Sequence, residues 1–383
     1  MIKGKAVYLN RFYSKMKFKS VEIGESISGA SPPAIFVGRH NYPRVFVGPL
    51  IPPQHGDTQI MDLPEQWIIN GKTVEDVVNF RLCLVRGKET LNVKDVYSKP
   101  VQTLQELALA KKSLEVDAEF KKKPRGGFFH EDVPPFGPSA PLKEIKLAEN
   151  PKWNLQLEKA YYDTDLKARD AMIELYEKGL FVSSIQKALS VGAFGLEKNR
   201  KLVPTRWSIT AVDDTISLYL LEKMKTYPKL DHYQVYEINT FNNRFVILLM
   251  PTEWRYEFLE AFIHVLGKEE VLFSDFEFYQ GRKDYASIGG CYYSTRLAIM
   301  EKLEEMKMQA GAIVFRESYP GYIPTGVWLV RECVREALRK IPAIFFDMNS
   351  ALSYISSRLW LPISRYKQQS ILLGQNLLSE FVR

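Results

Sequence analysis

Strand-type and helix-type segments follow one another along this chain without a regular order, and that pattern is the strongest constraint on its fold. Short runs rich in β-branched and aromatic residues alternate with longer runs of helical spacing, with no regular β-α-β period and no internal repeat. The longest purely apolar run, residues 245–250, is far shorter than the roughly 18 residues of a membrane span. We therefore predict an α+β protein without a membrane segment, built from mixed sheets and several packed helices.

Individual segments follow from the spacing of apolar residues. Strands are predicted over residues 34–37, 44–47, 233–239, 244–249, 272–279 and 312–317. Turn residues separate the first two strands and also the next two, so each pair is expected to form a hairpin. Helices are predicted over residues 73–81, 104–120, 154–178, 183–189, 215–225, 256–266, 294–310 and 328–340. Asp213 and Asp214 precede one of these helices and are interpreted as its N-cap.

The segment 121–151 interrupts this pattern with six prolines, three glycines and little periodicity. It predicts a long loop, and two interpretations stay open: a surface crossing over one domain, or a linker between domains. Lys121, Lys122, Lys123 and Arg125 lie at its start, where they are suited either to contact phosphate or to remain a solvated run of charge.

Composition narrows the class of protein. The chain has 383 residues, enough for about two domains, and 52 Lys and Arg against 45 Asp and Glu give a net charge of +7. This excess permits contact with a polyanion but is mild beside that of a dedicated nucleic-acid binder. The three cysteines are widely separated, and residues 1–20 lack the apolar stretch of a secretory signal. We expect a cytoplasmic protein with reduced thiols.

The last nine residues carry the most specific pattern in the chain. Gln375, Leu378 and Phe381 recur every three residues, so in a 3₁₀ turn they share one face as a polar head followed by two apolar groups. Gln-x-x-Leu-x-x-Phe-Val resembles the PCNA-interacting (PIP) motif, which implies docking on the sliding clamp of DNA replication. Val382 stands where many such motifs have a second aromatic residue. The alternative is a C-terminal helix that packs its leucines and Phe381 on the body.

Longer blocks resemble the archaeal Nre DNA-repair protein family over nearly the whole chain. They are SPPAIFVGR (31–39), YPRVFVGPLIPP (42–53), GDT (56–58), MDLPEQW (61–67), RKLVPTRWSITAVDDT (200–215), DYASIGGCYYSTRLA (284–298) and IPTGVW (323–328). The resemblance implies a DNA-repair factor that ends in a clamp-binding motif. It divides the chain into an N-terminal part, 1–268, and a C-terminal part, 269–365, before a flexible tail, 366–383. Some members begin with a cysteine-rich zinc-binding segment, which this chain lacks, so no zinc site is expected.

A pair of carboxylates is the first candidate for chemistry in the body. Asp275 and Glu277 lie two residues apart on a predicted strand and therefore face the same side, and Asp284 follows soon after. Two such carboxylates can share a divalent metal for phosphodiester cleavage. A half-exposed strand with polar outward positions produces the same pattern, so both interpretations are kept.

Two further sets of residues are candidates for binding phosphate or nucleic acid. Gly289 and Gly290 precede a predicted helix and can present N–H groups to an anion, with Arg296 one turn away, although a tight turn explains the glycines equally well. Basic residues beside turns and aromatic residues suit phosphate contact and base stacking; they are Arg39, Arg44, Arg200, Lys201 and Arg206. Surface solubility and packing of arginine on Trp207 are the alternative.

These observations combine into one expected function with two alternatives. The five histidines show no metal-ligand spacing, no cofactor is evident, and a divalent metal is expected only if the body is a nuclease. We expect a DNA-repair factor that the sliding clamp recruits through its tail and whose body contacts DNA. A metal-dependent nuclease acting on damaged or branched DNA and a nucleotide-binding or nucleotide-processing enzyme are the alternatives, so catalysis by the body stays open.

Overall fold

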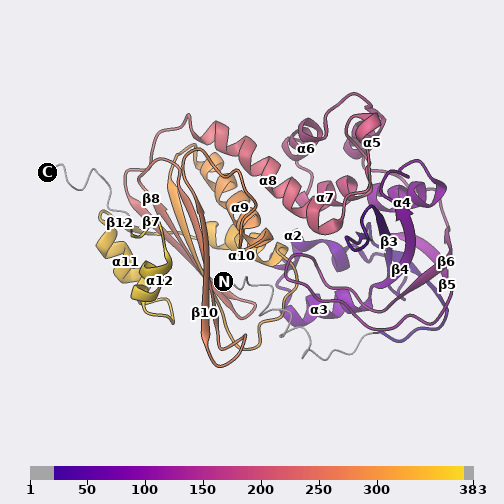
Figure 1. Ribbon diagram of the computed structural model, residues 1–383, viewed down its shortest axis with the longest axis horizontal. Helices are drawn as coiled ribbons and strands as arrows, with labels where there is room; N and C mark the ends of the chain where they lie inside the picture. The colour runs from indigo at the N-terminus through magenta and orange to yellow at the C-terminus, as the bar shows by residue number, and fades with distance from the viewer. Residues whose placement is uncertain (1–20, 375–383) are drawn as a thin grey trace. The chain divides into compact units, whose positions relative to one another are not determined.

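The computed structural model describes residues 21–374, which divide into two compact units. The N-terminal unit holds residues 21–216 and 324–328, and the C-terminal unit holds residues 217–323 and 329–374. Each unit contains one six-stranded mixed sheet with helices packed against it, which confirms the predicted α+β class (Figure 1). Among the described residues, every helix is too short or too polar to traverse a lipid bilayer.

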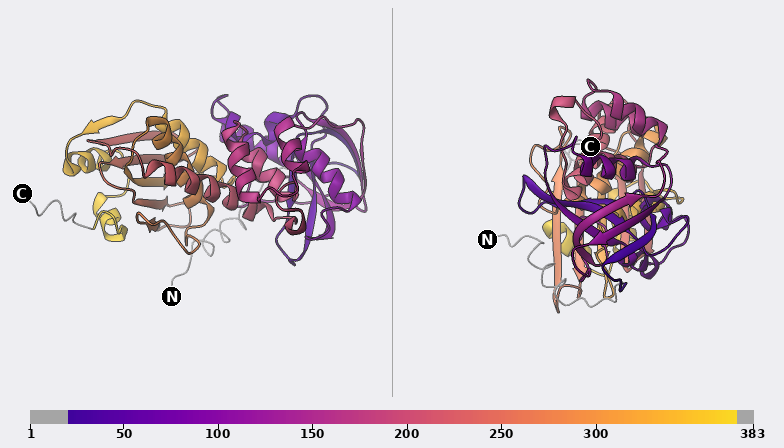
Figure 2. Two further views of the ribbon diagram at one scale, coloured as in Figure 1. Left: turned by 90° about the horizontal axis from the view of Figure 1, so that it is seen from above. Right: turned by 90° about the vertical axis from the view of Figure 1, so that its right-hand side faces the viewer.

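The sheet of the N-terminal unit carries its strands in the order β1, β5, β6, β4, β3, β2. Their bounds are β1 Ser26–Ser31, β2 Ile35–Val37, β3 Arg44–Ile51, β4 Val85–Asn92, β5 Leu114–Phe120 and β6 Ser139–Leu147. Only β4 and β6 run parallel, with Arg86 opposite Ser139, and the other neighbours are antiparallel. The predicted hairpin is confirmed as β2 and β3. Figure 2 shows the indigo and purple strands of this sheet from two further sides.

Short helices complete the N-terminal unit. They are the 3₁₀ helices η1 Gln59–Asp62 and η2 Glu197–Asn199, and α2 Pro64–Trp67, α3 Val74–Cys83, α4 Lys99–Leu109, α5 Leu155–Tyr162, α6 Ala168–Glu177 and α7 Val182–Ser190. A capping box begins α3: the Thr73 hydroxyl accepts from the N–H of Asp76 at 3.1 Å, and the Asp76 carboxylate accepts from the N–H of Thr73 at 2.9 Å. Asp163 ends α5 and accepts from the N–H of Leu166 at 3.0 Å, so the helix predicted over 154–178 is two helices joined by a turn.

Three predictions in this part of the chain are wrong. The helix over 104–120 ends as α4, and residues 114–120 form β5, in which buried and partly exposed positions alternate. Segment 121–151 lies within the N-terminal unit, so of the two interpretations the linker between domains is wrong; the prediction of loop throughout is also wrong, because residues 139–147 form β6 between β5 and β4. The helix expected from residue 215 is α8, Thr205–Met224, which starts directly after Pro204. Asp213 therefore lies inside a helix, where its buried carboxylate accepts from Gln186 Nε2 at 3.1 Å instead of capping.

The sheet of the C-terminal unit has the strand order β10, β9, β11, β8, β7, β12. The bounds are β7 Tyr233–Thr240, β8 Asn243–Met250, β9 Tyr256–Ile263, β10 Glu270–Glu277, β11 Gly311–Ser318 and β12 Ala343–Phe345. The helix predicted over 256–266 is wrong, because that segment is β9, a strand buried on both faces. The sequence boundary expected near residue 268 falls between β9 and β10, which are neighbours in this one sheet.

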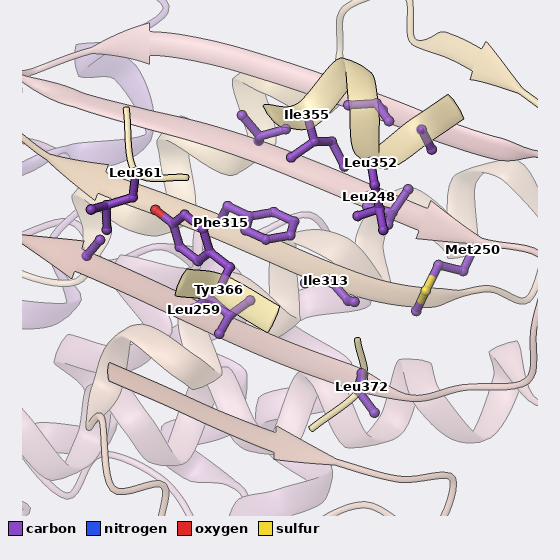
Figure 3. Close-up of a cluster of buried hydrophobic side chains, with 14 of the residues drawn as sticks. Leu248, Met250, Leu259, Ile313, Phe315, Leu352, Ile355, Leu361, Tyr366 and Leu372 are labelled. Carbon is purple, nitrogen blue, oxygen red and sulfur yellow. The ribbon is translucent and has the colours of Figure 1, made fainter. Parts of the chain in front are cut away.

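Helices cover both faces of this second sheet (Figure 1). On one face lie α9, Gly290–Met306, and α10, Trp328–Leu338, and on the other lie α11, Met348–Ser356, and α12, Ile363–Gln369. The second face carries an apolar cluster in which Leu259 and Phe315 of the sheet pack with Ile355 and Tyr366 of the helices (Figure 3). Burial of these side chains holds the two C-terminal helices on the sheet.

Two buried carboxylates on the same face fix the backbone that follows. Glu317 of β11 accepts from the N–H groups of Trp360 and Leu361 at 2.8 and 2.9 Å. Glu257 of β9 accepts from the N–H groups of Ile371 and Leu372 at 2.9 and 3.0 Å. The chain is therefore held on the sheet as far as residue 372, so the described part of the predicted tail is packed.

The residues predicted to bind the clamp lie outside the described part of the chain. They are Gln375, Leu378, Phe381 and Val382. Gln375 follows the anchored Leu372 after only two residues, Leu373 and Gly374.

Candidate nucleic-acid interface

Three of the exposed large aromatic side chains of the N-terminal unit come from the β2–β3 hairpin and from the start of α8. Tyr42, Phe46 and Trp207 have exposed fractions of 42%, 41% and 44%, and the ring centroids of Tyr42 and Trp207 are 5.2 Å apart. Aromatic rings of this size are normally buried in the core or in an interface. We call these three rings, together with Arg39, Arg86, Arg206 and Lys88, the aromatic–basic surface.

The local sequence explains why these rings face outward. In β3, Val45 and Val47 are fully buried while Arg44 and Phe46 are exposed, which follows from the period of two along a strand. Trp207 lies in the first turn of α8, a helix that begins at Thr205 directly after Pro204. A hydrogen bond from Val37 N to Thr205 Oγ1, 2.9 Å long, joins the end of β2 to this helix start.

Positive charges gather around Phe46. The ammonium group of Lys88 on β4 lies 6.0 Å from the centre of the Phe46 ring. Burial lowers the pKa of Lys88, and the positive charges of Arg86 and Lys122 lower it further, so the three cations lie close together. Lys122 lies at the start of segment 121–151, which was predicted to be a long loop. A cluster of like charges without matching acids is suited to bind an anionic chain.

A cavity of about 130 Å³ opens beside these residues. Its lining comes from the end of β2, from β3 and β4, from the segment after residue 127 and from the start of α8; the residues are Phe36, Val37, Gly38, Arg39, His40, Phe46, Arg86, Phe128, His130, Val133, Pro204 and Arg206. Three arginines and three phenylalanines thus line one small space. Such a combination offers both hydrogen-bond donors for oxygen atoms and flat faces for stacking.

Arg86 is the most deeply buried of the three arginines, with 7% of its surface exposed. Its Nη2 donates to the Phe46 carbonyl at 2.7 Å, its Nε is buried without a hydrogen-bond acceptor, and the guanidinium carbon lies 4.4 Å from the centre of the Phe36 ring. Burial lowers the pKa of Arg86 to about 9. A buried guanidinium is normally paired with a carboxylate, and in residues 21–374 Arg86 has none.

Arg206, by contrast, is partly neutralised. Its Nε lies 2.8 Å from a carboxylate oxygen of the buried Asp132, which also lies 3.4 Å from His130 Nδ1. The imidazole of His130 stacks on Phe128 with 6° between the planes and 6.1 Å between the centroids. Asp132 thus orients two cavity-lining side chains, while Arg86 keeps its uncompensated charge.

The structure brings together some of the residues predicted to contact nucleic acid and separates others. Arg39 and Arg206 line the same cavity, and Arg44 is exposed on the strand that carries Phe46. Arg200 is a structural residue, because it donates to the carbonyl groups of Gly195, Tyr161 and Asp163 at 2.7–2.9 Å and is 9% exposed. Lys201 is exposed but does not line the cavity.

The carboxylates predicted to share a metal bind protein donors instead. Asp275 pairs with Arg282 and accepts from the Ser287 hydroxyl at 2.9 Å. Glu277 is fully buried, pairs with Arg296 at 2.7 Å and accepts from Trp254 Nε1 at 2.9 Å. Among the described residues, no group of three or more His, Cys, Asp and Glu side chains is placed to hold a metal ion.

The predicted phosphate seat at the start of α9 is closed. Gly289 and Gly290 are both buried, and the φ angle of 81° at Gly289 makes the tight turn that glycine favours. Arg296 is 1% exposed and directed to Glu277, as above, and Asp284 is exposed, with its backbone carbonyl accepting from Arg282 at 3.2 Å. These contacts favour the structural interpretation of the turn.

Sequence reasoning missed Arg86, Lys88 and Phe128 as parts of the interface. Arg86 directly follows the apolar run 82–85, whose Leu84 and Val85 are buried, and this position was the available signal. Phe128 lies in segment 121–151, which was interpreted from its sequence as a loop. This segment lies beside β4 because its strand β6 pairs with β4 in parallel. That pairing joins residues about fifty positions apart and leaves no local pattern.

Exposed aromatic side chains interleaved with basic residues are the features with which proteins bind single-stranded nucleic acid. Comparison with known sequences identifies the family. The family described as "Archaeal Nre, N-terminal" matches residues 4–265, and "Archaeal Nre, C-terminal" matches residues 277–381. The chain belongs to the archaeal Nre family.

Three relatives extend the match over almost the whole chain. DNA repair protein NreB of Archaeoglobus fulgidus is 43% identical over 372 residues, which cover 94% of this chain and 93% of the relative. DNA repair protein NreA of the same organism is 37% identical, covering 89% and 87%, and DNA repair protein NreA of Haloferax volcanii is 35% identical, covering 91% and 86%. No solved structure matches this chain.

Proposed function

We propose that this protein is a DNA-repair factor that binds DNA at the aromatic–basic surface and that the sliding clamp recruits through residues 375–382. The names of three relatives, each a DNA repair protein, support the general role. The observation that carries DNA contact is the exposure of Tyr42, Phe46 and Trp207 beside three arginines and Lys88.

Stacking and charge act together at such a surface. An exposed aromatic ring that receives a base contributes about 1–3 kcal/mol to binding, irrespective of sequence. Each phosphate neutralised by Lys or Arg releases a counterion, which makes the affinity fall as salt rises. The surface supplies both, so we expect salt-dependent binding of single-stranded DNA with little sequence preference.

The clamp interaction is supported by the sequence of the tail and by the anchoring of the chain before it. Glu257 holds the backbone as far as Leu372, and the motif starts at Gln375. Along the sequence only Leu373 and Gly374 separate the anchored Leu372 from the start of the motif. A contact of this length buries little area and is weak alone, and simultaneous binding of DNA strengthens it.

No observation favours the nuclease or nucleotide-processing alternatives. The oxygen atoms of Asp275 and Glu277 are engaged by arginine and by neutral donors, and Glu277 has no exposed surface on its side chain. Gly289 and Gly290 are buried. We therefore propose a binding role for the body, with catalysis supplied by another protein at the clamp.

Two measurements test the proposal. Fluorescence anisotropy with a labelled single-stranded oligonucleotide, at several salt concentrations, compares the full chain with Phe46→Ala and Trp207→Ala. We expect each variant to lose about 5-fold to 100-fold in affinity, because each loses a stacking partner. Phe278→Ala is the matched control, since Phe278 is 43% exposed but lies in the C-terminal unit. Equal binding by all four proteins, or affinity independent of salt, contradicts DNA contact at this surface.

Calorimetry with the purified clamp tests the tail separately. The full chain and a chain that ends at Gly374 are compared, and we expect the shortened chain to lose binding to the clamp while keeping its affinity for DNA. Clamp binding that survives removal of Gln375 to Arg383 contradicts recruitment through the motif. Incubation with DNA and Mg²⁺ or Mn²⁺ in the same series reports any cleavage, which would contradict a purely binding role.

A further inference from the structure

Arg86 is a buried cation for which the described chain provides no anion. Of the five N–H donors that a guanidinium carries, the hydrogen bond to Phe46 O occupies one of those on Nη2. The guanidinium carbon also lies 4.4 Å from the centre of the Phe36 ring and 5.2 Å from the centre of the Phe136 ring. Aromatic faces stabilise a cation but accept no strong hydrogen bond. A site built in this way favours a ligand that brings acceptor atoms to Arg86.

The cavity beside Arg86 is small and partly apolar. Phe36 meets Phe128 edge to face, with 5.8 Å between the ring centroids and 63° between the planes, and Phe128 stacks on Phe136 at 4.8 Å. A volume of about 130 Å³ is well below the roughly 300–1,000 Å³ of pockets for drug-sized ligands. This space suits one planar heterocycle between aromatic rings.

Gly38 keeps the entrance open. A Cβ atom at this position would lie 3.2 Å from the Phe46 carbonyl oxygen and 3.6 Å from Arg86 Nη2. The Gly38 N–H donates to the same Phe46 carbonyl at 2.8 Å, so the backbone approaches Arg86 closely where a side chain would otherwise stand. Any larger residue here occupies space next to the guanidinium.

We propose that this cavity receives one unstacked base of a single DNA strand, with Arg86 donating a hydrogen bond to an acceptor atom on the edge of the base. This inference rests on the proposed function and names the part of DNA that the site recognises. The aromatic walls provide the stacking that a base loses when it leaves its neighbours. Arg39 and Arg206, which line the same cavity, are placed for the phosphates on either side of that base.

The acceptor atoms that reach Arg86 could belong to the base or to a phosphate, and the experiment separates the two sources. Fluorescence anisotropy of the full-length protein is measured with a thymidine oligonucleotide of about 12 nucleotides and with an abasic oligonucleotide of the same length. The two probes share their phosphates and differ only in the bases. Wild-type protein is expected to bind the thymidine probe at least tenfold more tightly.

Arg86→Met removes the donors and keeps an apolar chain of similar length. We expect it to weaken binding of the thymidine probe about tenfold, which is typical of a lost hydrogen bond to a charged group, and to leave binding of the abasic probe nearly unchanged. Gly38→Val keeps the Arg86 side chain in the sequence and fills the space beside its guanidinium; it is expected to have the same selective effect, so it serves if Arg86→Met does not fold. Arg44→Met is the matched control. Arg44 is exposed on β3, and its substitution should lower the affinity for both probes equally.

The outcomes are distinct. A loss of affinity for the thymidine probe alone, in both Arg86→Met and Gly38→Val, supports the base pocket. Equal loss of both probes in Arg86→Met would show that Arg86 binds phosphate and would overturn the assignment of a base. Wild-type protein that binds both probes equally overturns the base pocket while leaving DNA contact intact, whereas wild-type protein that binds neither overturns the proposed DNA contact itself.

Discussion

Glu317 offers a sharp test of how the C-terminal helices are attached to the sheet. Its side chain is fully buried and accepts four hydrogen bonds, from Trp360 N at 2.8 Å, Leu361 N at 2.9 Å, the Tyr366 hydroxyl at 2.9 Å and the Tyr319 hydroxyl at 2.6 Å. Glu317→Leu keeps much of the volume but removes every acceptor. The hydroxyl groups can rotate toward other partners, whereas the two backbone N–H groups are held in place by the chain.

The magnitude follows from those two N–H groups. Each buried donor left without a partner costs about 1–3 kcal/mol, and relief from burying the carboxylate offsets part of the sum. We expect a net loss of about 3 kcal/mol in the free energy of unfolding. For a domain of about 150–250 residues this lowers the melting temperature by about 6–12 °C.

Circular dichroism melting curves and amide hydrogen exchange measure the two consequences. The melting temperature should fall as stated, and the amides of Trp360 and Leu361 should exchange faster than in the wild-type protein. Glu305→Leu is the matched control, because Glu305 has 70% of its side chain exposed and forms only a surface pair with Lys302. A melting temperature within about 2 °C of the wild type, with both amides still protected, would refute the role given to Glu317.

Three further predictions concern buried charges. Glu277→Leu should destabilise the protein by about 3–5 kcal/mol, because it removes the buried carboxylate that balances the charge of Arg296. Urea unfolding should show that the double variant Glu277→Leu, Arg296→Met loses clearly less than the sum of the two single variants. Arg200→Met should lower stability by about 2–3 kcal/mol through three lost hydrogen bonds yet leave DNA affinity unchanged when anisotropy is measured well below the melting temperature. Burial raises the pKa of Glu257 above its ordinary value of 4.5, so the stability that this group contributes is full below pH 4.5 and declines as the pH rises through the raised value. Urea unfolding over this pH range should show a decline that is absent in Glu257→Gln.

The sequence was informative wherever the pattern was local. The two hairpins, 34–47 and 233–249, were predicted from alternation and turn residues and are present as β2–β3 and β7–β8. Alternation also places Arg44 and Phe46 on the outward face of β3. Strands buried on both faces were not predictable in this way, because β9 lacks alternation and its Glu257 and Glu260, three residues apart, imitate one face of a helix.

Roles of charged residues were decided by partners distant in the chain. Asp275 and Glu277 share one side of a strand as the sequence predicted, but Glu277 meets Arg296 from a helix nineteen residues further on. The same argument separates Arg200, whose donors are satisfied by backbone carbonyl groups, from Arg206, which lines the cavity. A one-dimensional pattern records residue types and spacing and not the acceptors that folding brings to them.

The sequence by itself determined the α+β class, the family and the two hairpins, because each depends on residue order or on spacing within a few positions. Tertiary structure alone decided that Arg86 is buried without an acid, that Phe36 and Phe128 stand beside it, and that Glu257 and Glu317 secure the chain before the tail. Hydrogen-bond partners and burial depend on segments that meet only when the sheets form, so the surroundings of Arg86 could be described only from the folded chain.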